Sequence, residues 1–445
     1  KKINMYIKTG HASLQSFRDK LYMKDFWFYF KSNPKDVLIV GSGTGDDVSA
    51  ALQRGVANID AVEIDPVIQK FGEYLHPDSP YNSPNVNVII DDARAHIRNT
   101  KKKYDLIVYG FLDSHSLLSN KSGGIRLDSY VYTVEAFREA RKILKDDGII
   151  QLSFATAKPE LGQKFYSMLK DAFDGQAPSV YKVGTQIGGG GHFFVVGNKM
   201  QSPPNFPQDY AIDISSDFEN GIYYADKSTD DWPFLYMPVR KYPITYVVVI
   251  MLLSIISFFY VGNLTTGSLR GFSIPCFFLG AGFMLVETKA ITELALYYGS
   301  TWIVISVVIA AILIMAFMAN LIVYKIGTPS TIKTYSFLFL SLLCGLLFTI
   351  IDIEYLPRNI STILMTSILT LPIFFSGFAF SNELRKTPSL PIAFSSNILG
   401  AMMGGFLEYN SMYFGFRSLY IFALLMYMIA FISSLKLSKK EPEFI

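Results

Sequence analysis

The spacing of hydrophobic residues changes near residue 240 of this 445-residue chain. Before that point, short apolar runs alternate with segments of helical period, which is typical of an α/β domain. After it, apolar runs follow one another, and several exceed the ~20 residues that a helix needs to cross a bilayer. The pattern predicts a nucleotide-type α/β domain followed by a helical membrane domain.

Five runs in the first half predict strands, because they are short, apolar and separated by helical stretches. They are VLIVG (37–41), DAVEID (60–65), VNVII (86–90), YDLIVYG (104–110) and GIIQLSF (148–154). YKVGTQI and HFFVVG flank a GGGG turn at 188–191 and predict two antiparallel strands. We therefore expect an α/β Rossmann-like doubly wound sheet, followed by an all-α polytopic membrane bundle.

Three glycines, at positions 41, 43 and 45, directly follow the first predicted strand and predict a tight turn into a helix. Asp65, which precedes a proline, predicts the N-cap of the helix after the second strand. Glu63 then ends that strand, 18 positions beyond Gly45. An acidic residue about 20 positions beyond such glycines typically binds ribose hydroxyls, so Glu63 is a candidate for that role.

The motifs VLIVGSGTGDDV, DAVEIDPVI, DDARAHI and YDLIVYG resemble those of the spermidine synthase-like branch of class I S-adenosylmethionine-dependent transferases, over about residues 35–200. The resemblance implies that the glycines admit the amino-acid tail, Glu63 binds the ribose, and Asp92 with Ala93 holds the adenine. The implied cofactor-binding set is Gly41, Gly43, Thr44, Gly45, Glu63, Asp92 and Ala93.

Two positions depart from the aminopropyltransferase pattern within this resemblance. Thr44 stands where those enzymes usually carry an Asp in the glycine turn, and Gly110 stands where a catalytic Asp follows the fourth strand. Both amine-handling carboxylates are thus missing from their usual places, and the GSGTG form resembles ordinary methyltransferases. We therefore expect intact S-adenosylmethionine as the cofactor, with decarboxylated S-adenosylmethionine as the alternative.

The polar stretch 110–137 follows the fourth strand and is the predicted acceptor site, because it lies beyond a strand end that should face the cofactor. The candidate catalytic residues are Asp113, His115 and Asp128, and the candidate substrate residues are Arg126, Tyr130 and Tyr132. A positioned carboxylate or imidazole there can take a proton from an acceptor. The alternative is that Asp113 caps a turn, His115 is solvated and the tyrosines pack on the sheet.

Seven apolar runs make up the second half of the chain. They lie near 243–262, 271–287, 300–324, 334–353, 360–382, 391–414 and 417–436. Gly400 and Gly404 predict close helix packing. Six polar residues could line a cavity or pair between helices: Glu287, Lys289, Glu293, Asn397, Glu408 and Asn410.

The stretches 278–302 and 397–415 resemble the membrane portion of multi-pass spermidine synthase-like proteins, in which further helices often precede the nucleotide domain. The chain begins with Lys1, so we expect that an upstream segment was removed or lies outside this sequence.

Positive charges near the helix ends bear on the topology. If all seven runs cross, a cytosolic nucleotide domain would share its side with fewer Lys and Arg than the other side carries. If 271–298 does not fully cross, the inner set becomes Arg240, Lys241, Lys325, Lys333, Arg385, Lys386, Lys436, Lys439 and Lys440. We therefore expect six crossings plus one re-entrant or interfacial element, in a bacterial inner membrane, with the nucleotide domain in the cytosol.

The expected domains are a lead-in segment (1–35), the nucleotide-binding domain (36–200), a linker and interfacial anchor (201–240), the membrane domain (241–437) and a tail (438–445). Trp232, Phe234 and Tyr236 suit the anchor, since aromatic residues favour the membrane interface.

Composition excludes some classes of function. A net charge of +3 without a basic stripe argues against nucleic-acid binding. Cys276 and Cys344 lie in apolar runs, and the five histidines fit no zinc spacing, so we expect no metal.

Three functions agree with these patterns. The first is a membrane-bound transferase that moves a methyl or related group from S-adenosylmethionine to a lipid-soluble or membrane-delivered acceptor. The second is aminopropyl transfer to a polyamine. The third is a transporter or sensor with a non-catalytic adenosyl-binding domain, and a continuous polar path through the helices would distinguish it.

Overall fold

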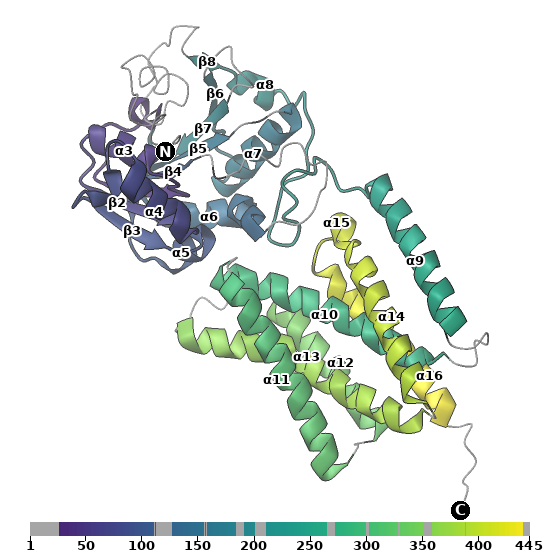
Figure 1. Cartoon of the computed structure of the whole chain (residues 1–445). Coiled ribbons are helices and arrows are strands. Elements are labelled where there is room, and N and C mark those ends of the chain that lie inside the picture. The colour runs from purple at the N-terminus through teal and green to yellow at the C-terminus, as the bar shows by residue number, and fades with distance from the viewer. Residues whose placement is uncertain are drawn as a thin grey trace, which may run out of the picture. The chain divides into compact units, whose positions relative to one another are not determined.

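The structure is a computed structural model. It describes residues 26–110, 112, 127–154, 156, 158–183, 191–200, 211–264, 272–299, 302–327, 330–349, 358–387 and 389–438. The chain divides into two compact units, an N-terminal unit (Lys1–Val239) and a helical unit (Arg240–Ile445), whose elements are labelled in Figure 1.

The N-terminal unit is built on an eight-stranded sheet in the order β3-β2-β1-β4-β5-β7-β6-β8. The strands are β1 (Asp36–Val40), β2 (Asn58–Glu63), β3 (Val86–Ile90), β4 (Tyr104–Tyr109), β5 (Leu144–Phe154), β6 (Ser179–Val183), β7 (Gly191–Gly197) and β8 (Ala211–Asp213). The first five strands are parallel, and the last three pair antiparallel. The predicted doubly wound sheet is confirmed, as is the antiparallel pairing of the two strands that flank the glycine-rich turn.

Helices cover both faces of this sheet, because its strands alternate apolar side chains between two cores. The helical elements are η1 (Phe26–Tyr29), α3 (Asp46–Gln53), α4 (Pro66–Leu75), η2 (Pro80–Asn82), α5 (Ala93–Asn99), η4 (Leu127–Tyr132), α6 (Val134–Lys142), α7 (Pro159–Ala172) and α8 (Ser215–Glu219). In β1, Leu38 and Val40 pack with α5, α6 and α7, whereas Val37 and Ile39 pack with α3 and η1. The aromatic residues of η1, which the sequence placed in a lead-in, therefore belong to the core.

The segment that precedes the helical unit is part of the N-terminal core, which corrects the predicted interfacial anchor. Trp232 is fully buried and Phe234 is 4% exposed. Lys164 on α7, also fully buried, donates to the carbonyl oxygens of Phe234 (2.9 Å) and Met237 (2.6 Å). Its ammonium also lies 4.6 Å from the centre of the Trp232 ring. The Trp232 ring and the Phe234 carbonyl thus contact a buried cation, whereas Tyr236, the third residue of the predicted anchor, is 39% exposed.

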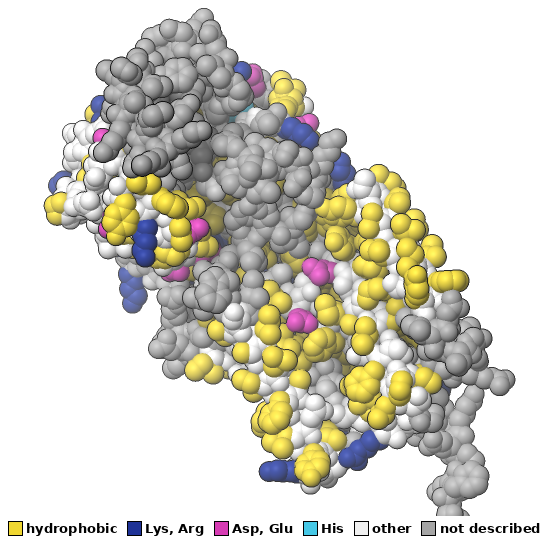
Figure 2. Space-filling view, viewed as in Figure 1, with side chains coloured by type: hydrophobic (Ala, Val, Ile, Leu, Met, Phe, Trp, Pro, Cys, Tyr) yellow, Lys and Arg dark blue, Asp and Glu magenta, His cyan; other side chains and the backbone are white. Residues whose placement is uncertain are grey.

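The helical unit contains α9 (Ile244–Leu264), α10 (Ile274–Tyr298), α11 (Trp302–Ile326), α12 (Thr331–Phe348), α13 (Arg358–Lys386), α14 (Leu390–Glu408), α15 (Ser411–Phe414) and α16 (Ser418–Ser438). Among the described residues, six helices are long and apolar enough to cross a membrane, namely α10 to α14 and α16. Figure 2 shows hydrophobic side chains over much of the visible face of this unit. A bundle of apolar helices after the α/β domain is as predicted.

Helix α10 is long and apolar enough to cross a membrane, contrary to the expectation that 271–298 does not fully cross. It is a continuous helix of 25 residues that packs against α11, α13, α14 and α16. Lys289 and Glu293, which are costly in hydrocarbon unless they pair, lie one turn apart and form a buried ion pair. Gly400 and Gly404 of α14 approach the α10 backbone as predicted, since a Cβ at Gly400 would lie 1.8 Å from a carbonyl oxygen of α10.

Helix α9 runs antiparallel to α14 along the bundle. Tyr242, just before α9, donates to Asn410 at 2.8 Å, and Ser254 in its middle lies 3.7 Å from the sulfur of Met403. Lys386 ends α13, just before the first residue of α14, and contacts both α12 and α16. Arg240 and Lys241 therefore lie at the other end of the bundle from Lys325, Lys333, Arg385, Lys386 and Lys436. The prediction that all these Lys and Arg residues lie on one side of the membrane is therefore wrong. The count of positive charges no longer argues for a cytosolic N-terminal unit.

Candidate functional site

The glycine turn after β1 has the backbone that its composition predicts. Gly41, Gly43 and Gly45 have φ angles of +69°, +56° and +100°, a region that favours residues without a Cβ. The amides of Gly41 and Ser42 both donate to the carbonyl oxygen of Val62 at 2.9 Å, which ties the turn to β2. This turn exposes backbone to a ligand and begins α3, so strand, turn and helix are arranged as in nucleotide-binding folds.

Glu63 ends β2 and is only 6% exposed. One carboxylate oxygen accepts from the amide of Gly43 at 2.7 Å, and the other accepts from the amide of Asp65 at 3.0 Å. Asp65 caps α4 as predicted, by accepting from the amide of Val67. Because each carboxylate oxygen has more than one lone pair, Glu63 can hold the turn and still accept ribose hydroxyls.

Asp92 lies at the same edge of the sheet as Glu63, because β2 and β3 are parallel and Glu63 pairs with Ile90. Asp92 is 2% exposed and caps α5 by accepting from the amide of Ala95 at 2.9 Å. Ala93 begins α5. The structure thus brings the predicted ribose and adenine residues to one edge, and their contacts with a ligand stay a prediction.

Tyr81 of η2 is a site residue that sequence reasoning missed. Its hydroxyl donates to the carbonyl oxygen of Gly43 at 2.7 Å and lies 2.9 Å from the Ser42 hydroxyl. Burial raises the pKa of Tyr81 above its ordinary value, which keeps the phenol a neutral donor. No spacing in the sequence indicates this contact, because only the fold brings Tyr81 to the turn.

The carboxylate of Asp47 on α3 lies beside Gly110, the residue that directly follows β4. A Cβ added at Gly110 would lie 2.7 Å from an Asp47 carboxylate oxygen. The Asp47 side chain is therefore in the space that a larger residue at 110 would need, and the residue is only 7% exposed. In the sequence, Asp47 belongs to the acidic pair that directly follows the glycine turn. The other member of the pair, Asp46, forms an ion pair with His76 at 3.2 Å.

The predicted acceptor residues are only partly within the described chain. Asp113, His115 and Arg126 lie outside the described residues, and only the backbone of Asp128 is described, in η4. Tyr130 and Tyr132 are 2% and 4% exposed, and the Tyr132 ring packs edge-on against Phe154 and Phe165. This burial favours the alternative in which the tyrosines pack on the sheet.

His192, the second residue of β7, lies at this same edge, because β7 is antiparallel to β5 and His192 pairs with Phe154, the last residue of β5. Its Nδ1 atom contacts the hydroxyl of Thr156. Burial, with a smaller effect from Lys182, lowers the pKa of His192 from 6.5 to about 4. The imidazole is therefore neutral near pH 7, with one donor and one acceptor nitrogen.

Comparison with known proteins agrees with this arrangement. The family model described as spermine/spermidine synthase domain matches residues 17–205. Polyamine aminopropyltransferase of Thermoplasma volcanium is 30% identical over 122 residues, covering 27% of this chain and 41% of that protein. Polyamine aminopropyltransferase of Methanocaldococcus jannaschii is 28% identical over 197 residues, covering 43% and 64%. The polyamine aminopropyltransferase of Korarchaeum cryptofilum is 28% identical over 121 residues, covering 26% and 35%.

Among solved structures, spermidine synthase from Thermotoga maritima resembles the chain at 19% identity with a TM-score of 0.33, covering 44% of this chain and 62% of that one. The chain spans about a third to two thirds of the length of these relatives. The family model thus matches within the N-terminal unit, and six apolar helices follow that unit among the described residues. The comparisons support the aminopropyltransferase alternative better than the membrane-bound methyltransferase, which they do not confirm.

Proposed function

We propose that the N-terminal unit transfers the aminopropyl group of decarboxylated S-adenosylmethionine to an amine. The family match and the named activity of the relatives support this class of reaction. The observation that carries the proposal is the buried carboxylate of Asp47 beside Gly110, because it supplies an amine-binding group that the sequence seemed to lack.

The donor fits the residues at the sheet edge. Glu63 would accept the ribose hydroxyls, Asp92 would hold the adenine amine, and the glycine turn would let the donor approach the backbone. Without its carboxylate, the donor has a cationic amine on its three-carbon arm. A buried carboxylate such as Asp47 is a suitable partner for the ammonium or amine of the acceptor, since charge-assisted hydrogen bonds are strong in a low dielectric.

In the reaction, the acceptor nitrogen attacks the propyl carbon that is bonded to the sulfonium sulfur. The new C–N bond forms as the C–S bond breaks, and the electron pair stays on sulfur, so 5′-methylthioadenosine leaves. The nitrogen then loses one proton to a base. Asp47 orients the acceptor nitrogen, and Asp113 remains the predicted proton acceptor, since it follows β4 by a few residues.

Methyl transfer from intact S-adenosylmethionine to a lipid-soluble acceptor is the competing function. The attached apolar helices favour it, because they would hold such an acceptor near the unit at high effective concentration. The by-product distinguishes the two reactions, because methyl transfer releases S-adenosylhomocysteine.

Purified full-length protein should be incubated with decarboxylated S-adenosylmethionine and a panel of diamines, with 5′-methylthioadenosine measured by mass spectrometry. We expect Asp47→Asn to lower kcat/KM for the amine by about 10-fold to 100-fold, as for loss of a charged hydrogen bond. Asp46→Asn is the matched control and should stay within about twofold, because the Asp46 side chain is 41% exposed and an ion pair at such a position contributes little. Wild-type turnover by Asp47→Asn would refute the role of Asp47, and no 5′-methylthioadenosine from wild type would refute aminopropyl transfer.

A further inference from the structure

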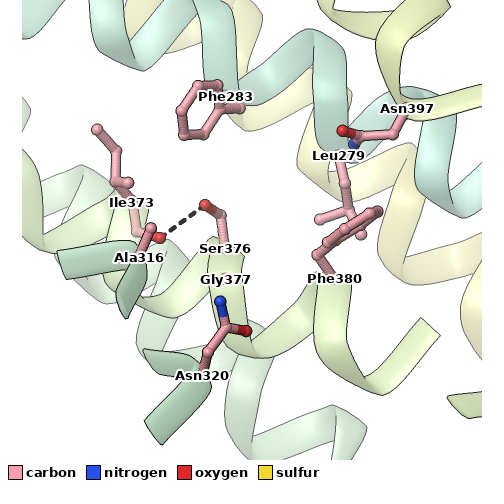
Figure 3. Close-up of a pocket in the computed structure, with 9 residues that line it drawn as sticks. All are labelled: Leu279, Phe283, Ala316, Asn320, Ile373, Ser376, Gly377, Phe380 and Asn397. Atoms are coloured by element: carbon pink, nitrogen blue, oxygen red, sulfur yellow. Dashed lines mark hydrogen bonds between the residues drawn. The ribbon is translucent and has the colours of Figure 1, made fainter. Parts of the chain in front are cut away.

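A cavity lies inside the helical unit, between α10, α11, α13 and α14 (Figure 3). Its described lining includes Phe283, Ala316, Asn320, Gly377, Phe380 and Asn397. The cavity has a volume of about 190 Å³. Because about 150 Å³ is enough for one benzene molecule, this volume admits a single six-membered ring with about two further heavy atoms.

Close contacts between helices surround the cavity, so loose packing does not explain it. A Cβ at Gly280 of α10 would lie 2.1 Å from the backbone carbonyl oxygen of Asn397 on α14. A Cβ at Gly377 of α13 would lie 3.0 Å from the Cβ of Ala319 on α11. Helix α10 thus packs tightly on α14, and α11 packs tightly on α13. Space remains between these pairs because Ala316, which lines it, has a small side chain.

The four helices place the cavity at a single depth. Leu279, Asn320, Phe380 and Asn397 lie five to seven residues from the nearest ends of α10, α11, α13 and α14. At the rise of an α-helix, this is roughly 8–10 Å from one end of the bundle. In a bilayer that these helices cross from end to end, this depth is the boundary between the head groups and the acyl chains. The ring of a neutral amphiphile lies at such a boundary.

Two amides in the cavity wall each keep one hydrogen-bonding group without a partner among the described residues. The Nδ2 atom of Asn397 donates to the carbonyl oxygen of Cys276 at 3.0 Å, which leaves its Oδ1 atom as an acceptor. The Oδ1 atom of Asn320 accepts from the hydroxyl of Ser381 at 3.0 Å, which leaves its Nδ2 atom as a donor. The hydroxyl of Ser376 already donates to a backbone carbonyl of its own helix. Figure 3 shows the two amides on opposite sides of the cavity.

The chemistry of the lining selects the class of ligand. Its described residues include no ionisable side chain, and a charge without a partner is costly in such a site, so the lining does not suit a polyamine. Phe283 and Phe380 supply aromatic walls, which favour an aromatic ring. Asn320 is exposed, and its free N–H groups need an acceptor in hydrocarbon. A ring that satisfies both amides needs an oxygen that accepts from Asn320 and, on its opposite side, a hydroxyl that donates to Asn397.

We propose that this cavity binds a hydroquinone-type ring, a neutral aromatic ring with oxygens at opposite positions. One hydroxyl donates to the Oδ1 atom of Asn397, and the opposite oxygen accepts from the Nδ2 atom of Asn320. The ligand is either a small hydroquinone or the ring head of a lipid, because the exposed side of the cavity at Asn320 lets a hydrocarbon tail extend outward. The oxidised quinone binds more weakly, because it has no hydroxyl to donate to Asn397.

The test is equilibrium dialysis of radiolabelled hydroquinone against the full chain in detergent, with ascorbate to keep the ring reduced and protein-free micelles as the baseline. Wild type should show saturable binding of about one molecule per chain. Ala316→Leu should lower the affinity about tenfold or more, because the longer side chain fills the cavity. Ala310→Leu is the matched control and should bind like wild type, because Ala310 is an exposed residue of the same helix outside the described lining.

Asn320→Leu tests the recognition of the ring oxygens. It should lower the affinity for hydroquinone about threefold to tenfold, as for loss of one hydrogen bond. It should not lower the affinity for para-xylene, which has the same shape without oxygens. Competition by a hydroquinone that carries a decyl tail would identify the ring head of a lipid as the ligand, and lack of that competition would identify a small molecule.

Three results would overturn the proposal. They are hydroquinone binding no greater than that of protein-free micelles, equal binding by wild type and Ala316→Leu, and an Asn320→Leu variant that keeps full affinity for hydroquinone or loses affinity for para-xylene equally. Aminopropyl transfer by Ala316→Leu and Asn320→Leu should match wild type, because both substitutions lie in the helical unit. Failure of this test therefore leaves the proposed enzyme activity standing.

Discussion

Glu63→Gln should open the glycine turn, because Glu63 uses both carboxylate oxygens to accept backbone amides. The amide of Gly43 lies 2.7 Å from one oxygen and that of Asp65 lies 3.0 Å from the other. Glutamine has one oxygen only, so its NH₂ group must face one of these N–H donors. A buried donor left without an acceptor costs about 1–3 kcal/mol, and loss of the charge weakens the remaining hydrogen bond. Together the two effects should cost about 2–4 kcal/mol.

Hydrogen–deuterium exchange of the full chain in detergent measures this local opening directly. Peptides that contain Gly43 and Asp65 should exchange about 30-fold to 1000-fold faster in Glu63→Gln, since each 1.4 kcal/mol is a factor of ten. Asp65→Asn is the control that also removes one negative charge, but asparagine is an equally good N-cap, so exchange should change little. Unchanged exchange in Glu63→Gln would show that Glu63 does not hold the turn.

Three further predictions concern other parts of the chain. Lys164→Met should expose the segment before the helical unit to limited proteolysis, because two buried carbonyls lose their donor, whereas the partly exposed Lys170→Met should not. His192 has a pKa of about 4 when folded and about 6.5 when unfolded, so the unfolded state binds more protons between these values. The contribution of His192 to folding stability is therefore complete above pH 6.5 and is lost as the pH falls toward 4. The thermal unfolding midpoint of His192→Gln in detergent should depend less on pH in this window than that of wild type. Cysteines at Lys241 and Lys436 should be labelled from opposite faces of sealed vesicles, and labelling from one face would contradict the antiparallel α9.

Local sequence patterns predicted much of the N-terminal unit, because its strands and turns depend on neighbouring residues. The glycine turn, the Asp65 cap and the position of Glu63 at a strand end all follow from short-range rules. Tyr81 and Asp47 were missed because their roles depend on tertiary contacts across 38 and 63 residues of chain. Composition also misassigned Trp232, because an aromatic residue suits a membrane interface and a buried lysine equally well.

The helical unit shows where counting charges fails. The count of Lys and Arg at the helix ends argued against a crossing at 271–298, yet α10 is long and apolar enough to cross, and the spacing of four residues lets Lys289 and Glu293 neutralise each other inside the bundle.

The donor that the N-terminal unit uses is the most direct test of its proposed activity. Full-length protein should be supplied with equal concentrations of S-adenosylmethionine and decarboxylated S-adenosylmethionine, together with diamines and membrane lipid, and both nucleoside by-products should be quantified by mass spectrometry. Aminopropyl transfer predicts that 5′-methylthioadenosine accumulates in step with the elongated amine and that S-adenosylhomocysteine stays at the level of the protein-free control. Accumulation of S-adenosylhomocysteine without 5′-methylthioadenosine would contradict the proposal and establish methyl transfer in its place.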